Sequence, residues 1–349
     1  MTTYSAELII DSSKIISNIS YLKSLTNNQS EFMFIVKSNA YGHGLKEIVE
    51  ILENYVDAFG VVRMEEAILA RKATSKPILL MQGIYTEHEI KTAKENNIQI
   101  VIHKMSQFEL IGKNNELGLW IKVNTGMNRL GLSQEELKLA YEKGIIGSDS
   151  VLMTHMACAD DPDDPMNKMQ INNFDIAFNI VERKTKRSIC NSACLINFPE
   201  LSFDWVRSGL AAYGGGFKNL NLKTAMTFRA PIISIRNIRK GERVGYGGRK
   251  KASKDMRIAI VYAGYADGIP QTTTDGTKVL VNDKQAEIFG KVSMDLVSID
   301  VTNLPQVSEN DLVSFWSEEL SINEFSNNNG LISYELMTRI SNRVKVKVI

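Results

Sequence analysis

The chain has 349 residues, of which 44% are hydrophobic and 23% charged, so it can bury a large core and is long enough for two domains. Its 41 basic and 40 acidic side chains give a net charge of +1, which excludes the strongly basic surface typical of proteins that bind nucleic acid or anionic membranes. The three cysteines are odd in number and lack paired zinc-ligand spacing; with no signal-peptide pattern and no membrane-length apolar run, they indicate a cytoplasmic protein with reduced thiols.

Short apolar runs alternate with amphipathic helical patterns up to about residue 210. Eight of these runs predict strands, near residues 32–36, 58–62, 77–82, 98–102, 117–123, 150–155, 188–191 and 204–208. A helix is expected over 45–52 and another after Ser133, where Glu136 completes a capping box. The alternation favours an α/β (β/α)8 barrel of the TIM type over residues 10–225, with an open doubly wound sheet as the alternative.

From about residue 226 the pattern changes to β runs separated by turn formers. Strands are expected at 231–235, 258–262, 279–281 and 297–301, with turns at 240–241, 282–283 and 327–330. We therefore expect a separate, mostly-β C-terminal domain over residues 226–349, on which residues 1–9 are candidates to pack.

Lys37 ends the apolar run 32–36 and is followed by the glycine-containing segment 38–44. Lysine is almost never buried without a partner, and an amine at the mouth of a core strand suits a Schiff base with a carbonyl cofactor. A lone lysine is nevertheless more often a surface charge. The pattern alone leaves both readings open.

Other polar residues also follow the carboxyl ends of proposed strands, where a barrel builds its active site. They are Asn124–Arg129, His155, Asn191–Ser192 and Arg207–Gly209. Because the loops after the last two barrel strands often bind phosphate, a phosphorylated cofactor is expected. Taken singly, Arg129, His155 and Arg207 are more often structural or solvated, and Tyr265 is more often an ordinary turn residue. The acidic loop 160–164 reads as a solvated turn, so no metal is expected.

The ordered set of these segments resembles the alanine racemase family, the pyridoxal-phosphate-dependent amino-acid racemases. The barrel part of the resemblance rests on segments 36–44, 122–131, 154–155, 191–193 and 207–209, and the C-terminal part on 245–248, 264–268 and 293–295. The resemblance covers nearly the whole chain and implies an alanine racemase that acts as a cytoplasmic homodimer and supplies D-alanine for peptidoglycan.

The resemblance implies that Lys37 forms the Schiff base with pyridoxal phosphate and is one catalytic base. Tyr265, delivered by the partner subunit, would be the other base on the opposite face of the cofactor. Racemisation needs both, because one group removes the α-proton and another returns a proton from the far side.

The resemblance also assigns roles to residues around these two bases. Arg207 would face the pyridine nitrogen, and Asn191 would also contact the cofactor. Arg129 and the partner's Met294 amide would bind the substrate carboxylate. The remaining implied roles are phosphate binding by Tyr41, Ser192 and the Gly209 and Leu210 amides, a hydrogen-bonded link from Tyr265 to Arg207 through His155, and carbamylation of Lys122.

Two positions depart from the family pattern: Ser188 replaces a histidine that many members have, and Asn342 replaces a tyrosine that some have. Both changes affect residues around the two bases and leave the bases intact. The alternatives are a racemase for serine, lysine or a broad amino-acid range, a pyridoxal-phosphate decarboxylase on a related barrel, and a non-catalytic pyridoxal-phosphate carrier with only the barrel.

Overall fold

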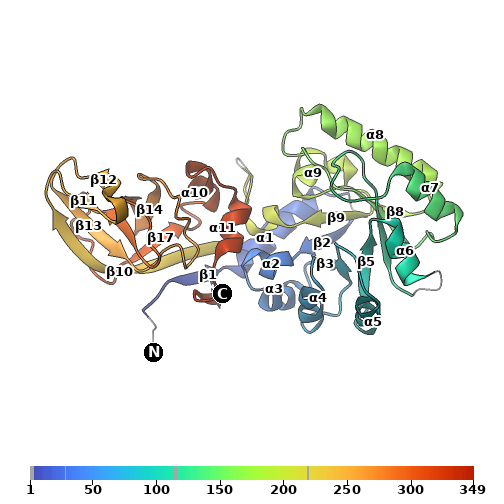
Figure 1. Cartoon of the computed structure of the whole chain (residues 1–349), viewed down its shortest axis with the longest axis horizontal. Coiled ribbons are helices and arrows are strands. Elements are labelled where there is room, and N and C mark those ends of the chain that lie inside the picture. The colour runs from blue at the N-terminus through green and yellow to red at the C-terminus, as the bar shows by residue number, and fades with distance from the viewer. Residues whose placement is uncertain (1–3, 28, 113–115, 218–219) are drawn as a thin grey trace. The chain divides into compact units, whose positions relative to one another are not determined.

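The computed structural model describes residues 4–27, 29–112, 116–217 and 220–349. They form two compact units (Figure 1). The barrel unit comprises Ile19–Ala40 and Gly44–Ala212, and the β unit comprises the chain up to Asn18, Tyr41–His43 and Tyr213–Ile349. The domain boundaries expected near residues 10 and 225 stay predictions of the sequence.

The barrel unit contains eight parallel strands in the order β8-β7-β6-β5-β4-β3-β2-β9. They are β2 (Glu31–Ile35), β3 (Ala58–Val61), β4 (Ile78–Leu80), β5 (Ile98–Ile102), β6 (Leu119–Lys122), β7 (Val151–Met153), β8 (Lys186–Ser188) and β9 (Trp205–Ser208). The two end strands approach each other where the Arg207 N–H donates to the Cys190 carbonyl oxygen at 3.0 Å. The expected (β/α)8 barrel is confirmed.

Helices alternate with these strands around the barrel (Figure 1). They are α1 (Ser12–Ser24), α2 (Lys37–Tyr41), α3 (Leu45–Leu52), α4 (Met64–Arg71), α5 (Glu87–Glu95), α6 (Met105–Ile111), α7 (Gln134–Glu142), α8 (Pro165–Ile180) and α9 (Ser192–Asn197). The predicted helix 45–52 is confirmed, and its apolar face is buried. The predicted capping box at α7 is also present, since Ser133 Oγ accepts from the Glu136 N–H at 3.1 Å.

The seventh predicted barrel strand was placed a few residues too late. We expected it at 188–191, whereas β8 covers Lys186–Ser188. The strand includes the charged residue Arg187, whose guanidinium lies 3.8 Å from the Phe203 ring centre and 4.5 Å from that of Phe178. A charged side chain that covers aromatic rings in this way fits a strand although its sequence looks polar.

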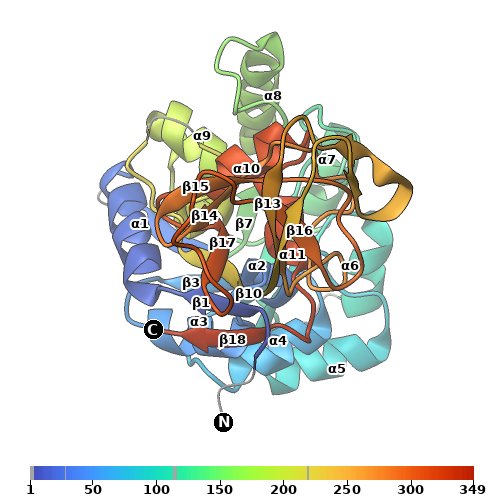
Figure 2. The same ribbon diagram turned by 90° about the vertical axis from the view of Figure 1, so that its left-hand side faces the viewer.

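The β unit is built on an eight-stranded sheet in the order β13-β16-β15-β14-β17-β10-β1-β18 (Figure 2). These strands are β1 (Glu7–Ile10), β10 (Met226–Ile238), β13 (Met256–Val261), β14 (Lys278–Val281), β15 (Lys284–Ile288), β16 (Val297–Asp300), β17 (Leu312–Trp316) and β18 (Lys345–Val348). The smaller elements are β11 (Arg243–Val244), β12 (Lys250–Lys251), α10 (Ile322–Asn328) and α11 (Ser333–Arg339). The four strands expected after residue 226 all lie in or overlap strands of this sheet.

The expected turn at 327–330 was partly wrong, because α10 continues to Asn328. Asn329 then caps the helix, and Gly330 takes a positive φ of 65°, which ends it.

The strand β1 lies near one edge of the sheet, where it pairs in parallel with β18 and antiparallel with β10. Residues 1–3 of the segment expected to pack on this domain lie outside the described residues. No helix in the described part of the chain is long and apolar enough to span a bilayer.

Candidate active site

Lys37 follows β2 after one intervening residue, Val36, and begins a turn of unusual backbone geometry. Ser38, Asn39 and Ala40 have φ angles of 53°, 55° and 52°, which is the left-handed helical region. For non-glycine residues this conformation costs roughly 1–2 kcal/mol each, so surrounding contacts must hold it. Ala40 N–H donates to the Val36 carbonyl at 2.8 Å, and the Asn39 side chain accepts from the Leu45 N–H at 2.9 Å. The pKa of Lys37 is lowered by burial and by Arg129, which favours a neutral, nucleophilic amine.

Lys122 ends β6 and is only 8% exposed. Burial, followed by the charges of Arg207, Arg129 and Lys37, lowers the pKa of Lys122 to about 8. His155 follows β7, and its pKa is affected by the positive charges of Arg207, Lys122, Arg129 and Lys37. The pKa of the His155 imidazole lies well below its ordinary value because of burial and these charges, so the ring is neutral. The barrel unit therefore brings together five of the predicted site residues.

Arg207 is the most deeply buried of the four cationic side chains, Lys37, Lys122, Arg129 and Arg207, which together with the neutral His155 we call the cationic cluster. Its guanidinium donates to Ser188 Oγ and, at 2.6 Å, to the Thr154 carbonyl oxygen. Burial lowers the pKa of Arg207 to about 10, and the group stays protonated near neutrality. Within the described residues no aspartate or glutamate forms an ion pair with it. The guanidinium is thus held by neutral acceptors. These acceptors do not neutralise its positive charge, which remains available to interact with a bound group.

Ser188 directly contacts Arg207, although it departs from the family pattern. Its Oγ donates to the Trp205 carbonyl at 2.8 Å while it accepts from Arg207. The other departing residue, Asn342, is exposed in the β unit.

The predicted phosphate loops follow β8 and β9. Asn191 caps α9, because its Oδ1 accepts from the Cys194 N–H at 2.9 Å, and its amide nitrogen lies 3.5 Å from His155 Nε2. Ser192 Oγ accepts from the Gly209 N–H at 3.2 Å, which joins the two loops. Leu210 begins a short 3-10 helix, Leu210–Tyr213. Hydroxyl and backbone N–H donors at two helix starts are suited to an anion.

Gln170 of α8 is a fully buried residue that the sequence analysis missed. Its Nε2 donates to Thr125 Oγ1 and to the His155 carbonyl oxygen, both at 3.0 Å, and its Oε1 accepts from the Ala157 N–H at 2.8 Å. It therefore bridges the loop after β6 and the loop after β7. Thr125 Oγ1 in turn lies 2.8 Å from Thr154 Oγ1, next to the carbonyl that accepts from Arg207. A polar residue within a helical pattern does not by itself indicate such contacts, so the sequence could not predict this role of Gln170.

Arg129 is exposed at the rim of the barrel unit, in the loop after β6. Asn124 Oδ1 accepts from the Gly126 and Asn128 N–H groups at 3.1 and 3.0 Å, which folds this loop tightly. Gly131 is required here, since an added Cβ would lie 2.4 Å from the Asn124 nitrogen. The loop conformation thus presents Arg129 to solvent.

Tyr41 belongs to the β unit, where it is buried between two other tyrosines. Its ring centre lies 5.0 Å from that of Tyr213 and 5.8 Å from that of Tyr334. Burial raises the pKa of the Tyr41 phenol, which therefore stays protonated and able to donate a hydrogen bond.

Tyr265 and Met294 lie on adjacent segments of the β unit. The Tyr265 N–H donates to the Ser293 carbonyl and the Ala266 N–H to the Met294 carbonyl, both at 3.0 Å. Gly264 permits this approach, because a Cβ there would lie 2.3 Å from the Met294 carbonyl oxygen.

An arginine bridges the two segments from the side. Arg343 pairs with Asp267 Oδ1 at 2.9 Å and with Asp295 Oδ1 at 2.7 Å. Asp267 Oδ2 also accepts from the Gly264 N–H at 2.8 Å. The positions of Tyr265 and Met294 are therefore coupled by both backbone and side-chain contacts.

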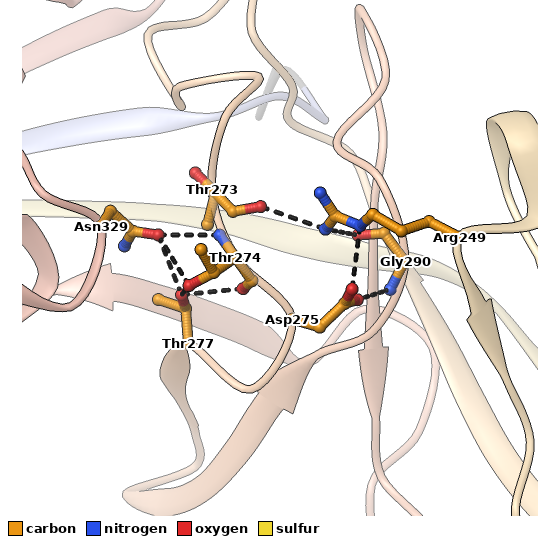
Figure 3. A network of polar contacts seen from close by, with 7 residues as sticks. All are labelled: Arg249, Thr273, Thr274, Asp275, Thr277, Gly290 and Asn329. Carbon is orange, nitrogen blue, oxygen red and sulfur yellow. Dashed lines mark hydrogen bonds and ion pairs between the residues drawn. The ribbon is translucent and has the colours of Figure 1, made fainter.

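Tyr265 and Met294 line a pocket of about 310 Å³ in the β unit, together with Tyr246, Gln271 and Lys291. Figure 3 shows the polar network that holds neighbouring segments of these loops. Arg249 pairs with Asp275 at 2.8 Å and donates to the Thr273 and Gly290 carbonyls, and Asn329 accepts from the Thr274 N–H at 2.8 Å. These bonds hold segments that lie close in sequence to the pocket-lining residues Gln271 and Lys291.

Comparisons with known proteins agree over nearly the whole chain. The family model for the alanine racemase N-terminal domain matches residues 10–216, and that for the alanine racemase C-terminal domain matches residues 225–348. An alanine racemase from Legionella pneumophila (strain Lens) is 36% identical over 354 residues, covering 97% of this chain and 98% of that protein.

Solved structures give the same result. The structure of alanine racemase from Acinetobacter baumannii has a TM-score of 0.93 at 36% identity and covers 99% of this chain and 100% of its own. Alanine racemase from Bartonella henselae with covalently bound pyridoxal phosphate has a TM-score of 0.90 at 27% identity, with 99% of both chains covered.

Proposed function

The chain belongs to the alanine racemase family of isomerases, and on this basis we propose that it interconverts L-alanine and D-alanine with pyridoxal phosphate as its cofactor. The observation that carries the proposal is Lys37 at the carboxyl end of β2, within the cationic cluster. Its pKa is lowered by burial and by Arg129, which prepares the amine to attack a carbonyl group.

The residues present fit pyridoxal phosphate. Bound there, the cofactor would supply an electron-withdrawing ring that stabilises negative charge at the substrate α-carbon. Arg207 carries a positive charge and, among the residues that the structure describes, has no acidic partner, as expected of a group that faces the pyridine nitrogen. Because it retains its proton, it would limit the electron withdrawal of the ring. Ser192, the Gly209 and Leu210 amides and Tyr41 would hold the phosphate, with Asn191 bracing this loop.

Two bases would act on the substrate α-carbon. The Lys37 amine would take or return the proton on one face, and the partner subunit's Tyr265 would do so on the other. Delivery of the phenol by a second copy would require a homodimer with shared sites. The fixed coupling of the Tyr265 and Met294 segments supports a common role for them.

Further residues would bind the substrate and tune the bases. Arg129 and the partner's Met294 amide would bind the substrate carboxylate, which suits an exposed guanidinium on a rigid loop. His155, as a neutral imidazole beside Arg207, would pass a hydrogen bond from the tyrosine to the arginine. Lys122 would react with CO2 through its neutral amine, giving a carbamate and one released proton, and the resulting negative charge would brace Arg129.

The product, D-alanine, would serve peptidoglycan synthesis in the cytoplasm. The competing substrates are serine, lysine and other amino acids, because the side-chain volume that the site accepts decides specificity. Comparing kcat/KM across L-amino acids separates these cases: alanine is expected to give the highest value. A higher value for serine or lysine would replace the proposed substrate.

The direct test of the proposal is a spectrum of the purified protein before and after borohydride. A lysine-bound cofactor absorbs near ~420 nm, and reduction fixes it on one peptide for mass spectrometry. We expect the label on Lys37 and no racemisation by Lys37→Ala. Labelling of another lysine, or wild-type racemisation by that variant, would contradict the assignment.

A further inference from the structure

Glu66 of α4 divides its two carboxylate oxygens between two loops of the barrel unit. Its Oε2 accepts from the Val62 and Arg63 N–H groups at 3.0 and 3.1 Å, which caps its own helix. Its Oε1 accepts from the Ser38 N–H at 2.6 Å, the shortest of the three bonds. One carboxylate therefore joins the loop after β3 to the residue that follows Lys37.

The partner of this bond is the first residue of the left-handed turn. Ser38 has φ and ψ angles of 53° each, and it is not a glycine, so an external contact is needed to hold the conformation. A charged acceptor makes a stronger hydrogen bond than a neutral one. Because Ser38 immediately follows Lys37, the bond also limits the direction in which the lysine side chain leaves the strand.

Other capping glutamates of the same barrel make no comparable contact among the described residues. Glu89 of α5 uses Oε2 alone, which accepts from the Tyr85 N–H at 2.7 Å and the Thr86 N–H at 3.0 Å. Glu136 of α7 likewise accepts from the Ser133 N–H of its own loop at 2.9 Å. The contact of Glu66 with the preceding loop is therefore no general consequence of a capping box.

We propose that Glu66 is a positioning residue for Lys37: its Oε1 holds the left-handed turn at Ser38 and so orients the amine toward the cofactor. The inference rests on the proposed function, in which Lys37 carries pyridoxal phosphate. The negative charge of Glu66 adds a second effect, since it opposes the lowering of the Lys37 pKa by burial and Arg129.

The test compares Glu66→Gln with Glu89→Gln. A glutamine has one acceptor oxygen, so at position 89 it can keep every bond made by Oε2, whereas at position 66 either the helix cap or Ser38 loses its acceptor. The first measurement is hydrogen–deuterium exchange over residues 37–44 in the chain without cofactor. The second is the affinity of that chain for pyridoxal phosphate, followed by absorbance.

We expect Glu66→Gln to exchange faster over 37–44 and to bind pyridoxal phosphate roughly ten- to a hundredfold more weakly, in line with the loss of one charged hydrogen bond. Glu89→Gln is expected to stay within about twofold of the wild type in both. Ser38→Gly, which removes the penalty on positive φ, should reduce the exchange effect of Glu66→Gln. Global unfolding in urea serves as the control for a general loss of stability.

Wild-type exchange over 37–44 in Glu66→Gln would overturn the proposal, and so would equal effects of the two glutamine variants. If Glu66→Gln does not fold, the exchange of the Ser38 amide in the wild-type chain decides, because a bond to Glu66 that holds the turn must protect this N–H. Exchange of that amide at the rate of an unprotected turn amide would show that the Glu66 bond does not hold the turn. Borohydride labelling of a lysine other than Lys37 would defeat the proposed function and leave the exchange comparison intact, so the two failures are distinguishable.

Discussion

Lys122 and Arg207 are buried cations in one small region of the barrel unit, and their neighbours in the cluster are also basic. Burial disfavours the charged form of both, and each additional positive charge adds to this effect on Lys122. Such an arrangement is expected where anionic groups complete the site. A phosphorylated cofactor, a substrate carboxylate and a carbamate would each supply negative charge.

The reactivity of Lys122 follows from its pKa of about 8. Only the neutral amine reacts with CO2, and its fraction rises as the pH rises through that value. We predict a carbamate signal in the carbon-13 NMR spectrum with labelled bicarbonate that grows between about pH 7 and 9. Lys122→Met is the control and should lack the signal. A signal that is unchanged in this variant would assign the carbamate to another amine.

Bonds between neighbouring loops recur around the barrel unit. Glu66 joins the loops after β2 and β3, Gln170 those after β6 and β7, and Ser192 those after β8 and β9. Each bridge fixes one loop relative to the next, so the side chains at the strand ends need not reorganise on binding.

Gln170→Leu tests one such bridge. The change leaves the Ala157 N–H and the His155 carbonyl without their partner, and we predict a loss of about 1–3 kcal/mol in the free energy of unfolding. It should also lower kcat, because His155 and Thr125 would no longer be fixed. Asn167→Leu is the matched control, since Asn167 is a buried amide of the same helix that binds Cys158 and Asp161. Equal kinetic effects of both variants would refute a specific role for Gln170.

The coupling of the Tyr265 and Met294 segments predicts a different result for Gly264→Ala. Because the new Cβ would collide with the Met294 backbone, the two segments must separate. Racemisation is expected to fall at least about tenfold, as for other displacements of reacting groups by an ångström. Cofactor attachment should persist, since Lys37 lies in the barrel unit. Spectra and rates measured on one sample test this, and parallel loss of both properties would contradict it.

The sequence predicted much of the fold because apolar runs and their spacing carry it. Seven of the eight barrel strands lie where the runs were expected, and β8 was displaced because Arg187 packs on aromatic rings despite its charge. The strand β1 was not predicted as an element, since four residues give little periodicity, and its partners β10 and β18 are distant in sequence.

The candidate site also contains some residues that the sequence could indicate and others that it could not. The place of Lys37 at the end of a core strand could be predicted from the apolar run before it, and its role stays a prediction. Glu66 and Gln170 could not be predicted, because their roles depend on which loops lie side by side and on which oxygen accepts each hydrogen bond. The sequence identifies Ser188 only as a departure from the family pattern. Its hydrogen bond to Arg207 becomes visible only in the structure.

In the proposed homodimer, each complete site takes Lys37 from one copy and Tyr265 from the other. Mixing Lys37→Ala and Tyr265→Phe chains, unfolding and refolding them together, tests this arrangement. Each variant alone lacks one base at every site and should be inactive. In a two-fold symmetric mixture half of the dimers combine both variants, and one of their two sites is intact, so about a quarter of wild-type racemisation should return. If the mixture stays as inactive as the separate variants, the two bases do not come from different subunits.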